Sequence, residues 1–169
     1  NEFSRGLQGN PLSYAEARRM LYEISSSPGY HFFVRLIAAG ATAFVYALLF
    51  KGGAGEGIAA LIVSMVAYAV KVRISAAGIF QFFEFFASGL AAGALCLAAV
   101  CAVPGLNIYK TIVGAIMIFV PGVAITNSIK DALYGDTVSS LSRLTEAALV
   151  TAAVGSGVGM ALTVGFRFI

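Results

Sequence analysis

Most of the side chains that could bind a small molecule or exchange a proton with it lie in two short stretches. Residues 121–131 begin with a proline–glycine pair and contain Asn127 and Asp131, four positions apart. Arg143 and Glu146 follow at a spacing of three. Residues at these spacings share one face of a helix, and their amide, guanidinium and carboxylate groups can bind polar or charged molecules. A structural ion pair of Arg143 with Glu146 or Asp131 is the alternative for the arginine.

The proline–glycine pair should break a helix. Proline removes a backbone donor and clashes with the carbonyl four residues before it. Residues 111–120, just before the pair, carry no charge. Inside a membrane such a break is tolerated only where protein or a water-filled cavity covers it. Broken helices near the midplane commonly form substrate sites of transporters, and the freed backbone of Pro121 and Gly122, with Thr126 close by, fits that pattern. A simple proline kink is the alternative, because both residues are common in transmembrane helices.

The composition is that of an integral membrane protein. Hydrophobic residues make up 59% of the 169 residues and charged residues 11%, whereas soluble domains carry about 25% charged residues. A membrane-spanning helix needs about 20 residues. We therefore expect an all-α transmembrane domain over residues 30–169, in which five helices span the membrane and the fourth is broken at the proline–glycine pair. The expected spans are about 30–50, 57–72, 76–103, 109–132 and 138–166.

Residues 1–29 are the soluble-looking part of the chain. Ser13 and Glu16 form a capping-box pattern, and apolar positions after them predict a short amphipathic helix. We expect a cytoplasmic linker that is the remnant of a soluble N-terminal domain, and a helix lying on the bilayer is the alternative. Because the chain begins at Asn1 rather than at methionine, we expect a fragment or a processed chain.

The positive charges predict the orientation. Lysine and arginine are enriched in cytoplasmic loops. Eight of them fall on one side of the predicted spans and three on the other. We therefore expect a multi-pass protein of the cytoplasmic (inner) membrane with its N-terminus in the cytoplasm. The eight are Arg5, Arg18, Arg19, Arg35, Lys71, Arg73, Lys130 and Arg143, and the three are Lys51, Lys110 and Arg167.

Ionisable residues inside a membrane are functional candidates by default. Glu84 lies about eight residues into the third span among four phenylalanines, and it could carry a proton. An interfacial carboxylate at headgroup depth is the alternative for it. The directions of the spans place five polar residues in one half of the membrane. The proline–glycine break lies deeper than these residues, nearer the midplane. The expected result is a polar vestibule open to the cytoplasm, formed by Glu84, Asn127, Asp131, Arg143 and Glu146.

Other features point to packing rather than chemistry. The glycine pairs at 89 and 93 and at 155 and 159 have the spacing of small-residue helix-packing motifs. Cys96 and Cys101 are about 7.5 Å apart along a helix axis, so we expect no bridge between them. The sequence has no cluster of cysteine and histidine and one interfacial histidine, His31. We expect no metal and no cofactor, and the net charge of +3 needs no nucleic-acid partner.

Residues 120–131, Gly135-Asp136 and residues 139–147 together resemble the signature of the threonine/serine exporter family. The same signature occurs in the smaller type of two-component exporter, one of which is associated with succinate. A looser resemblance runs from Ser13 to Leu162. This resemblance implies a cytoplasmic domain, five spans, a further five-span unit that is fused or separate, and proton-driven export. This chain lacks most of that domain and the second unit, and has Ser140 where many relatives have glycine.

We therefore expect one half of a secondary-active exporter of small polar metabolites, with threonine and serine ahead of a dicarboxylate. A dicarboxylate exporter subunit, a non-transporting membrane scaffold and a channel are the alternatives, and an enzyme is the least expected. Expected partners are a second five-span unit, the bilayer, a small polar substrate and further copies in an oligomer. The expected substrate-binding residues are Pro121, Gly122, Thr126, Asn127 and Arg143, and the expected coupling residues are Asp131, Glu146 and Glu84.

Overall fold

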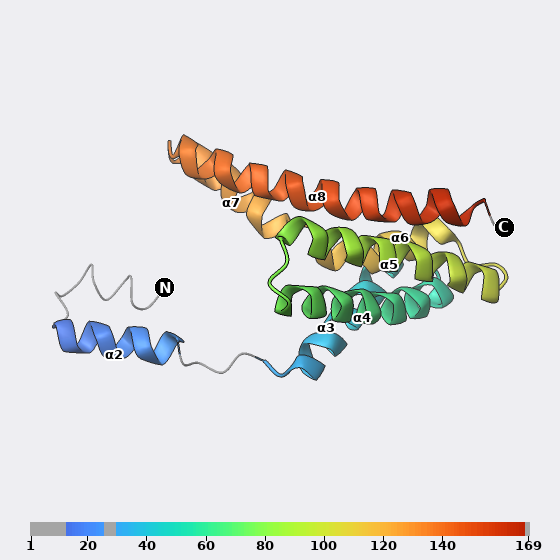
Figure 1. Cartoon of the computed structure of the whole chain (residues 1–169), viewed down its shortest axis with the longest axis horizontal. Helices are drawn as coiled ribbons and strands as arrows, with labels where there is room; N and C mark the ends of the chain where they lie inside the picture. Colours follow the sequence, from blue (N-terminus) through green and yellow to red (C-terminus); the bar gives the residue numbers. More distant parts are fainter. Residues whose placement is uncertain (1–12, 26–29, 168–169) are drawn as a thin grey trace. The chain divides into compact units, whose positions relative to one another are not determined.

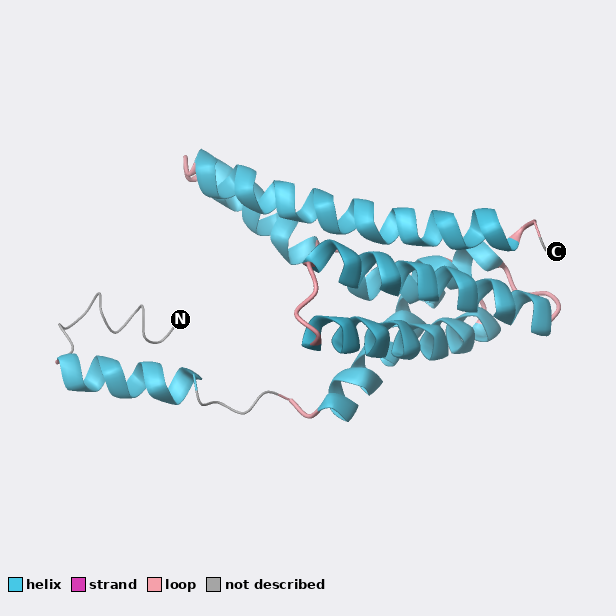
Figure 2. Ribbon diagram, viewed as in Figure 1, coloured by secondary structure: helices cyan, strands magenta, loops and turns pink. Residues whose placement is uncertain are grey.

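The computed structural model describes residues 13–25 and 30–167 of the chain. All regular elements in these two ranges are helical, as the composition predicts (Figures 1 and 2). The chain divides into two units, Asn1–Phe32 and Phe33–Ile169, which are described separately here. The elements are α2 (Tyr14–Ser25), α3 (Phe32–Leu49), α4 (Ala54–Ala76), α5 (Gln81–Ala102), α6 (Ile108–Ile116), the 3₁₀ helix η1 (Met117–Phe119), α7 (Gly122–Leu133) and α8 (Thr137–Gly165).

The first unit contains α2, which begins with the predicted capping box. Ser13 N donates to Glu16 Oε2 at 3.1 Å, and Glu16 N donates to Ser13 Oγ at 3.4 Å. The two reciprocal bonds satisfy amides that the first helical turn leaves without a partner, so the predicted start of this helix is confirmed. The rest of the predicted linker, residues 1–12 and 26–29, lies outside the described residues.

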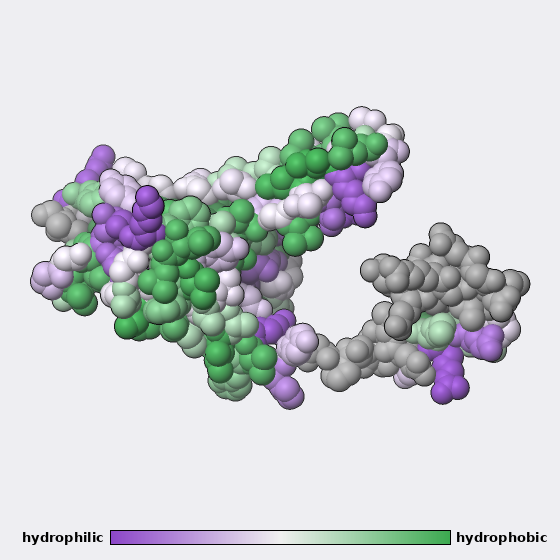
Figure 3. All heavy atoms as spheres, turned by 180° about the vertical axis from the view of Figure 1, so that it is seen from behind, coloured by the Kyte–Doolittle hydropathy of each residue, from purple (hydrophilic) through white to green (hydrophobic). Residues whose placement is uncertain are grey.

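The second unit is a bundle of membrane-spanning helices. Four helices, α3, α4, α5 and α8, are long and apolar enough to cross a membrane. The pair from α6 to α7 passes the same test as a fifth span, and it is bent by 58° at the break. Large apolar side chains are exposed on the outer faces of the helices, as contact with lipid requires (Figure 3); they include Ile37, Val45, Ile58, Ile62, Leu141 and Leu149. The predicted all-α membrane fold with one broken helix is confirmed.

The break in the fourth span has a local cause. After α6 the backbone tightens into η1, whose last turn closes when Val120 N donates to Met117 O at 3.2 Å. Pro121 has no amide hydrogen to continue the helix. A new helix starts at Gly122, and Ile125 N donates to Pro121 O at 3.1 Å. The chain therefore changes direction at the residues that the sequence indicated.

The connection between the second and third spans differs from the prediction, since α4 ends later than residue 72 and α5 begins at Gln81 rather than at residue 76. The sequence predicts that the second span ends near Val72 and that the third begins near Ala76. In the structure α4 continues to Ala76, and the chain turns at Gly78, whose φ of +70° suits glycine. A charged side chain need not end a helix if it has an interaction partner. Lys71 has one, because its ammonium lies over the ring of Phe85 on the next helix.

Small residues set the helix spacing in the bundle. Helix α5 lies along α8 and also packs against α4 (Figure 1). A Cβ on Gly89 would lie 2.5 Å from Val154 O of α8, and one on Gly93 would lie 2.8 Å from the Cβ of Ala161. The predicted packing role of the 89 and 93 pair is therefore confirmed, since close approach of two helices requires such small residues.

The second glycine pair behaves differently. At Gly155 and Gly159 an added Cβ would meet no atom within 4 Å, so neither packs against another described helix. Gly157 takes the packing role instead, and a Cβ there would overlap Phe86 O. Two residues along a helix turn the side chain through about 200°, so Gly155 and Gly159 point away from α5 where Gly157 faces it, and Gly155 lines a small cavity beside Phe119 and Val120 of the broken span.

Candidate functional site

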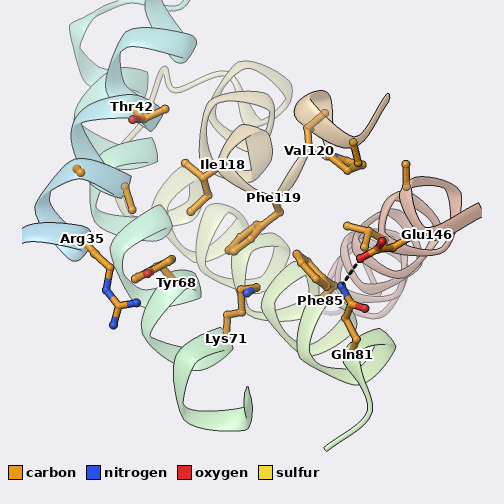
Figure 4. Close-up of a pocket in the computed structure, with 16 residues that line it drawn as sticks. Arg35, Thr42, Tyr68, Lys71, Gln81, Phe85, Ile118, Phe119, Val120 and Glu146 are labelled. Atoms are coloured by element: carbon orange, nitrogen blue, oxygen red, sulfur yellow. Dashed lines mark hydrogen bonds between the residues drawn. The ribbon is translucent and has the colours of Figure 1, made fainter. Parts of the chain in front are cut away.

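A cavity of about 550 Å³ opens in one half of the bundle (Figure 4). Its size is in the range typical of small-molecule sites. Four helices and the broken span contribute to its wall, which combines an apolar surface with a few charged and polar groups. The polar lining residues are Arg35 and Thr42 from α3, Tyr68 and Lys71 from α4, Gln81 from α5 and Glu146 from α8.

The broken span builds one wall of this cavity. Ile118 and Phe119 of η1, then Val120 and Pro121, line it in succession. The ring of Phe119 packs edge-on against Phe85 of α5, with ring centroids 6.2 Å apart. The 3₁₀ helix ends at Phe119 and Val120 after it is extended, with φ of −67° and ψ of 125°, so irregular backbone forms this wall.

The cationic side of the cavity comes from α3 and α4. Arg35 and Lys71 both line it, together with Tyr68 (Figure 4). Lys71 Nζ lies 4.0 Å from Glu84 Oε2 and 4.8 Å from the centroid of the Phe85 ring. The Lys71 side chain is 27% exposed and that of Glu84 is 12% exposed. Lys71 lines the cavity and Glu84 does not, so the lysine is the member of this pair that a ligand can reach.

An acidic group faces the cavity from the other side. Glu146 of α8 is exposed and lines the cavity opposite Arg35 and Lys71 (Figure 4). Gln81 Nε2 donates to Glu146 Oε1 at 3.4 Å, which ties the carboxylate to the start of α5. The aromatic ring of Phe85 lies between the two charged sides. The cavity therefore offers positive charge at one wall and negative charge at the other.

Asp131 and Arg143, two of the residues singled out from the sequence, pair with each other. Arg143 Nε donates to Asp131 Oδ2 at 2.9 Å, and the bond joins α7 to α8. The Asp131 side chain is 26% exposed and that of Arg143 is 50% exposed, and neither residue belongs to the cavity lining. This arrangement is the structural ion pair that the sequence left open as an alternative for Arg143.

The remaining predicted residues on α7 also lie outside the described lining. Thr126 Oγ1 donates to Gly122 O at 2.9 Å, so its hydroxyl is used within its own helix. Asn127 is half-buried on the same helix and does not line the cavity. Ser128, which was not among the predicted site residues, is buried and donates from Oγ to Ser140 O at 2.9 Å. This bond holds α7 against α8 at the unusual Ser140.

The sequence reasoning missed most of the polar lining. In the sequence Arg35 and Lys71 bear only on the orientation, Gln81 only shares a helix face with Glu84, and nothing marks Thr42 or Tyr68 as polar lining. A periodic signal exists, because residues 35, 38, 39 and 42 share one face of α3, and Tyr68 and Lys71 are three apart on α4. Spacing alone does not say which face of a helix looks into the bundle.

Hydrogen bonds join two connections at the opposite end of the bundle. Glu56 at the start of α4 accepts from Gly53 N at 2.8 Å and from Asn107 N at 3.1 Å. Lys110 Nζ donates to Lys51 O at 2.7 Å. These bonds tie the connection after α3 to the connection before α6. The cavity residues lie toward the other ends of the same helices.

Comparison with known families identifies the chain. Within the described residues no three His, Cys, Asp or Glu side chains are grouped as a metal site would require. A family described as "Putative threonine/serine exporter" matches residues 1–165. Searches of the curated proteins and of the solved structures each found no match. Since the family match covers nearly the whole chain, this multi-pass membrane protein belongs to the threonine/serine exporter family.

Proposed function

We propose that this chain exports threonine and serine and that a proton gradient drives the export. The observation that carries the proposal is the opposition of charge across the cavity, with Arg35 and Lys71 on one side and Glu146 on the other. An amino acid is a zwitterion, so its carboxylate and its ammonium complement these two sides. Family membership supports small hydroxy amino acids as the substrate class.

Glu146 is the group that fits proton coupling best. As a carboxylate it attracts the ammonium of the substrate, and once protonated it loses that attraction. One proton and one substrate molecule therefore compete for the same side chain. Such competition couples inward movement of protons to outward movement of substrate, because each ligand lowers the affinity for the other. Asp131 is a weaker candidate, since Arg143 already binds it outside the cavity.

The same geometry argues against a dicarboxylate. One carboxylate of succinate would meet Lys71, but the other would face Glu146 across the cavity. Like charges at short range repel strongly where water is excluded. Threonine and serine replace that second carboxylate with an ammonium, so the charge pattern favours them.

The orientation and the partner belong to the same proposal. The excess of lysine and arginine on one side supports an N-terminus in the cytoplasm and a cavity open toward it. Five spans are an odd number for a transporter built from paired repeats. We infer that a second five-span unit completes the pathway in the cytoplasmic membrane.

Transport into inverted vesicles tests this function. The vesicles would contain the chain with its candidate five-span partner, and labelled threonine, serine and succinate would be offered with and without an imposed proton gradient. We expect gradient-dependent accumulation of threonine or serine and little of succinate. Preferred transport of succinate would overturn the substrate assignment. A folded complex that moves none of the three would favour a scaffold instead.

A further inference from the structure

We propose that Lys71 binds the carboxylate of the transported amino acid and that Glu84 and Phe85 hold the lysine in position for it. The inference rests on the proposed function and adds the orientation of the substrate in the cavity. The carboxylate lies toward α4 and the ammonium toward Glu146 on α8. This assignment moves the carboxylate site from the proline–glycine break and Arg143 to a different helix.

Lys71 is the cation best placed for this role. Its ammonium is held over the ring of Phe85 at 4.8 Å, and its side chain is 27% exposed, so the surrounding protein excludes part of the water. Arg35 also lines the cavity but is exposed. A charge with fewer water neighbours interacts more strongly with a charged ligand. Arg143 already donates to Asp131 and does not line the cavity.

Glu84 offsets the cost of burying that lysine without consuming its donors. The 4.0 Å between Lys71 Nζ and Glu84 Oε2 is an ion-pair distance, longer than a hydrogen bond. An ammonium has three donors, so Lys71 can still donate to a carboxylate that enters from the cavity. Glu84 is 12% exposed and lies outside the lining. It is therefore a positioning residue that acts on the substrate through Lys71.

The charged groups around the site set the direction of the substrate. Arg35 and Lys71 make one side of the cavity positive, while Gln81 and Glu146 face them from α5 and α8. Phe85 lies between the two sides (Figure 4). A zwitterion placed the other way round would bring its carboxylate to Glu146 and its ammonium to Lys71, with two repulsive contacts.

Binding of two matched ligands tests the assignment. L-threonine and L-threoninol share the ammonium and the side-chain hydroxyl, but threoninol has a hydroxymethyl group in place of the carboxylate. Affinities would be measured on the purified complex of this chain with its candidate five-span partner in lipid nanodiscs. We expect the wild type to bind threonine about 10- to 100-fold more tightly than threoninol, the size expected for a hydrogen bond to a charged group.

The Lys71→Met variant should remove this preference. Its affinity for threonine should fall to that for threoninol, and its affinity for threoninol should stay as in the wild type. Lys71→Arg should restore part of the preference. Arg73→Met is the matched control, because Arg73 is an exposed cation on the same helix outside the cavity lining. This control should keep the full preference.

A double-mutant cycle tests the positioning role of Glu84. Glu84→Gln should weaken threonine binding several-fold and leave threoninol binding unchanged, which a general loss of structure would not do. Combined with Lys71→Met it should add no further loss, because interacting residues are not additive.

Two results would overturn the inference in distinguishable ways. If the wild type binds threonine and Lys71→Met or a folded Lys71→Gln keeps the preference over threoninol, the role of Lys71 is wrong while the proposed function stands. If the wild type binds neither ligand, the proposed function fails, and the role of Lys71 fails with it.

Discussion

Arg143 Nε donates a 2.9 Å hydrogen bond to Asp131 Oδ2, and this ion pair joins α7 to α8 away from the cavity. Glu146 lies three residues further along α8 and faces the cavity. Two acids that look equivalent in the sequence therefore have different surroundings. One is neutralised by an arginine and the other is open to a ligand.

Asp131→Asn should leave gradient-driven export of threonine largely intact. The variant loses an ion pair between partly exposed side chains, and such pairs contribute at most about 1 kcal/mol to stability. We expect a small decrease in the thermal midpoint of the purified protein and a near-normal initial rate of transport in vesicles. Complete loss of export from a folded Asp131→Asn protein would make Asp131 the coupling residue instead.

Glu146→Gln should abolish accumulation driven by the proton gradient. Glutamine can keep the hydrogen bond with Gln81 but cannot carry the charge that attracts an ammonium. The measurement is labelled threonine accumulated in vesicles with an imposed gradient, and Asp131→Asn serves as the matched acid-to-amide control. Equal accumulation by the Glu146→Gln protein and the wild type would remove Glu146 from the coupling mechanism.

The first turn of α8 should become less stable in acid, because its N-cap is the carboxylate of Asp136. Hydrogen bonds from Ser139, including one from Ser139 N to Asp136 Oδ1 at 3.1 Å, hold the pKa of Asp136 below its usual range. A carboxyl whose pKa is lowered by folding stabilises the folded state above its unfolded pKa. That contribution is lost as the pH falls through the lower, folded pKa.

Hydrogen exchange would measure this effect. Amides in the first turn of α8 should exchange faster as the pH falls below the usual aspartate range, after correction for intrinsic exchange. Asp136→Asn keeps a side-chain acceptor for the cap and should show no such pH dependence, while Asp136→Ala should exchange fast at every pH. A pH response that persists in Asp136→Asn would assign it to another group.

Glycine-to-leucine substitutions should separate the two faces of α8. Gly157→Leu places a side chain against the backbone of α5 at Phe86 and should destabilise the bundle by about 1–3 kcal/mol or more. Gly159→Leu enters open space and is the matched control, with little effect on the chain alone. Thermal unfolding in detergent compares them. Similar losses for both variants would contradict the packing of α5 on α8.

Part of the fold and part of the site could be predicted from residues close together in the sequence. The apolar segments, the capping box of Ser13 and Glu16, and the break at Pro121 depend on local hydrophobicity, spacing and a missing amide hydrogen. Pro121 and Glu146, both singled out from the sequence, do line the cavity. The end of α4 could not be predicted in this way, because Lys71 contacts Glu84 and Phe85 on the next helix, and the sequence does not show these contacts.

The sequence by itself determined the class of protein, the family signature and the position of the broken span. Only the tertiary structure decided which polar side chains share a cavity. The 58° bend at Pro121 carries α7 away from the axis of α6, so Asp131 meets Arg143 on α8 rather than the cavity. Close packing through Gly89, Gly93 and Gly157 sets which faces of α5 and α8 meet. These long-range contacts bring Lys71 and Glu146 to opposite walls of one site.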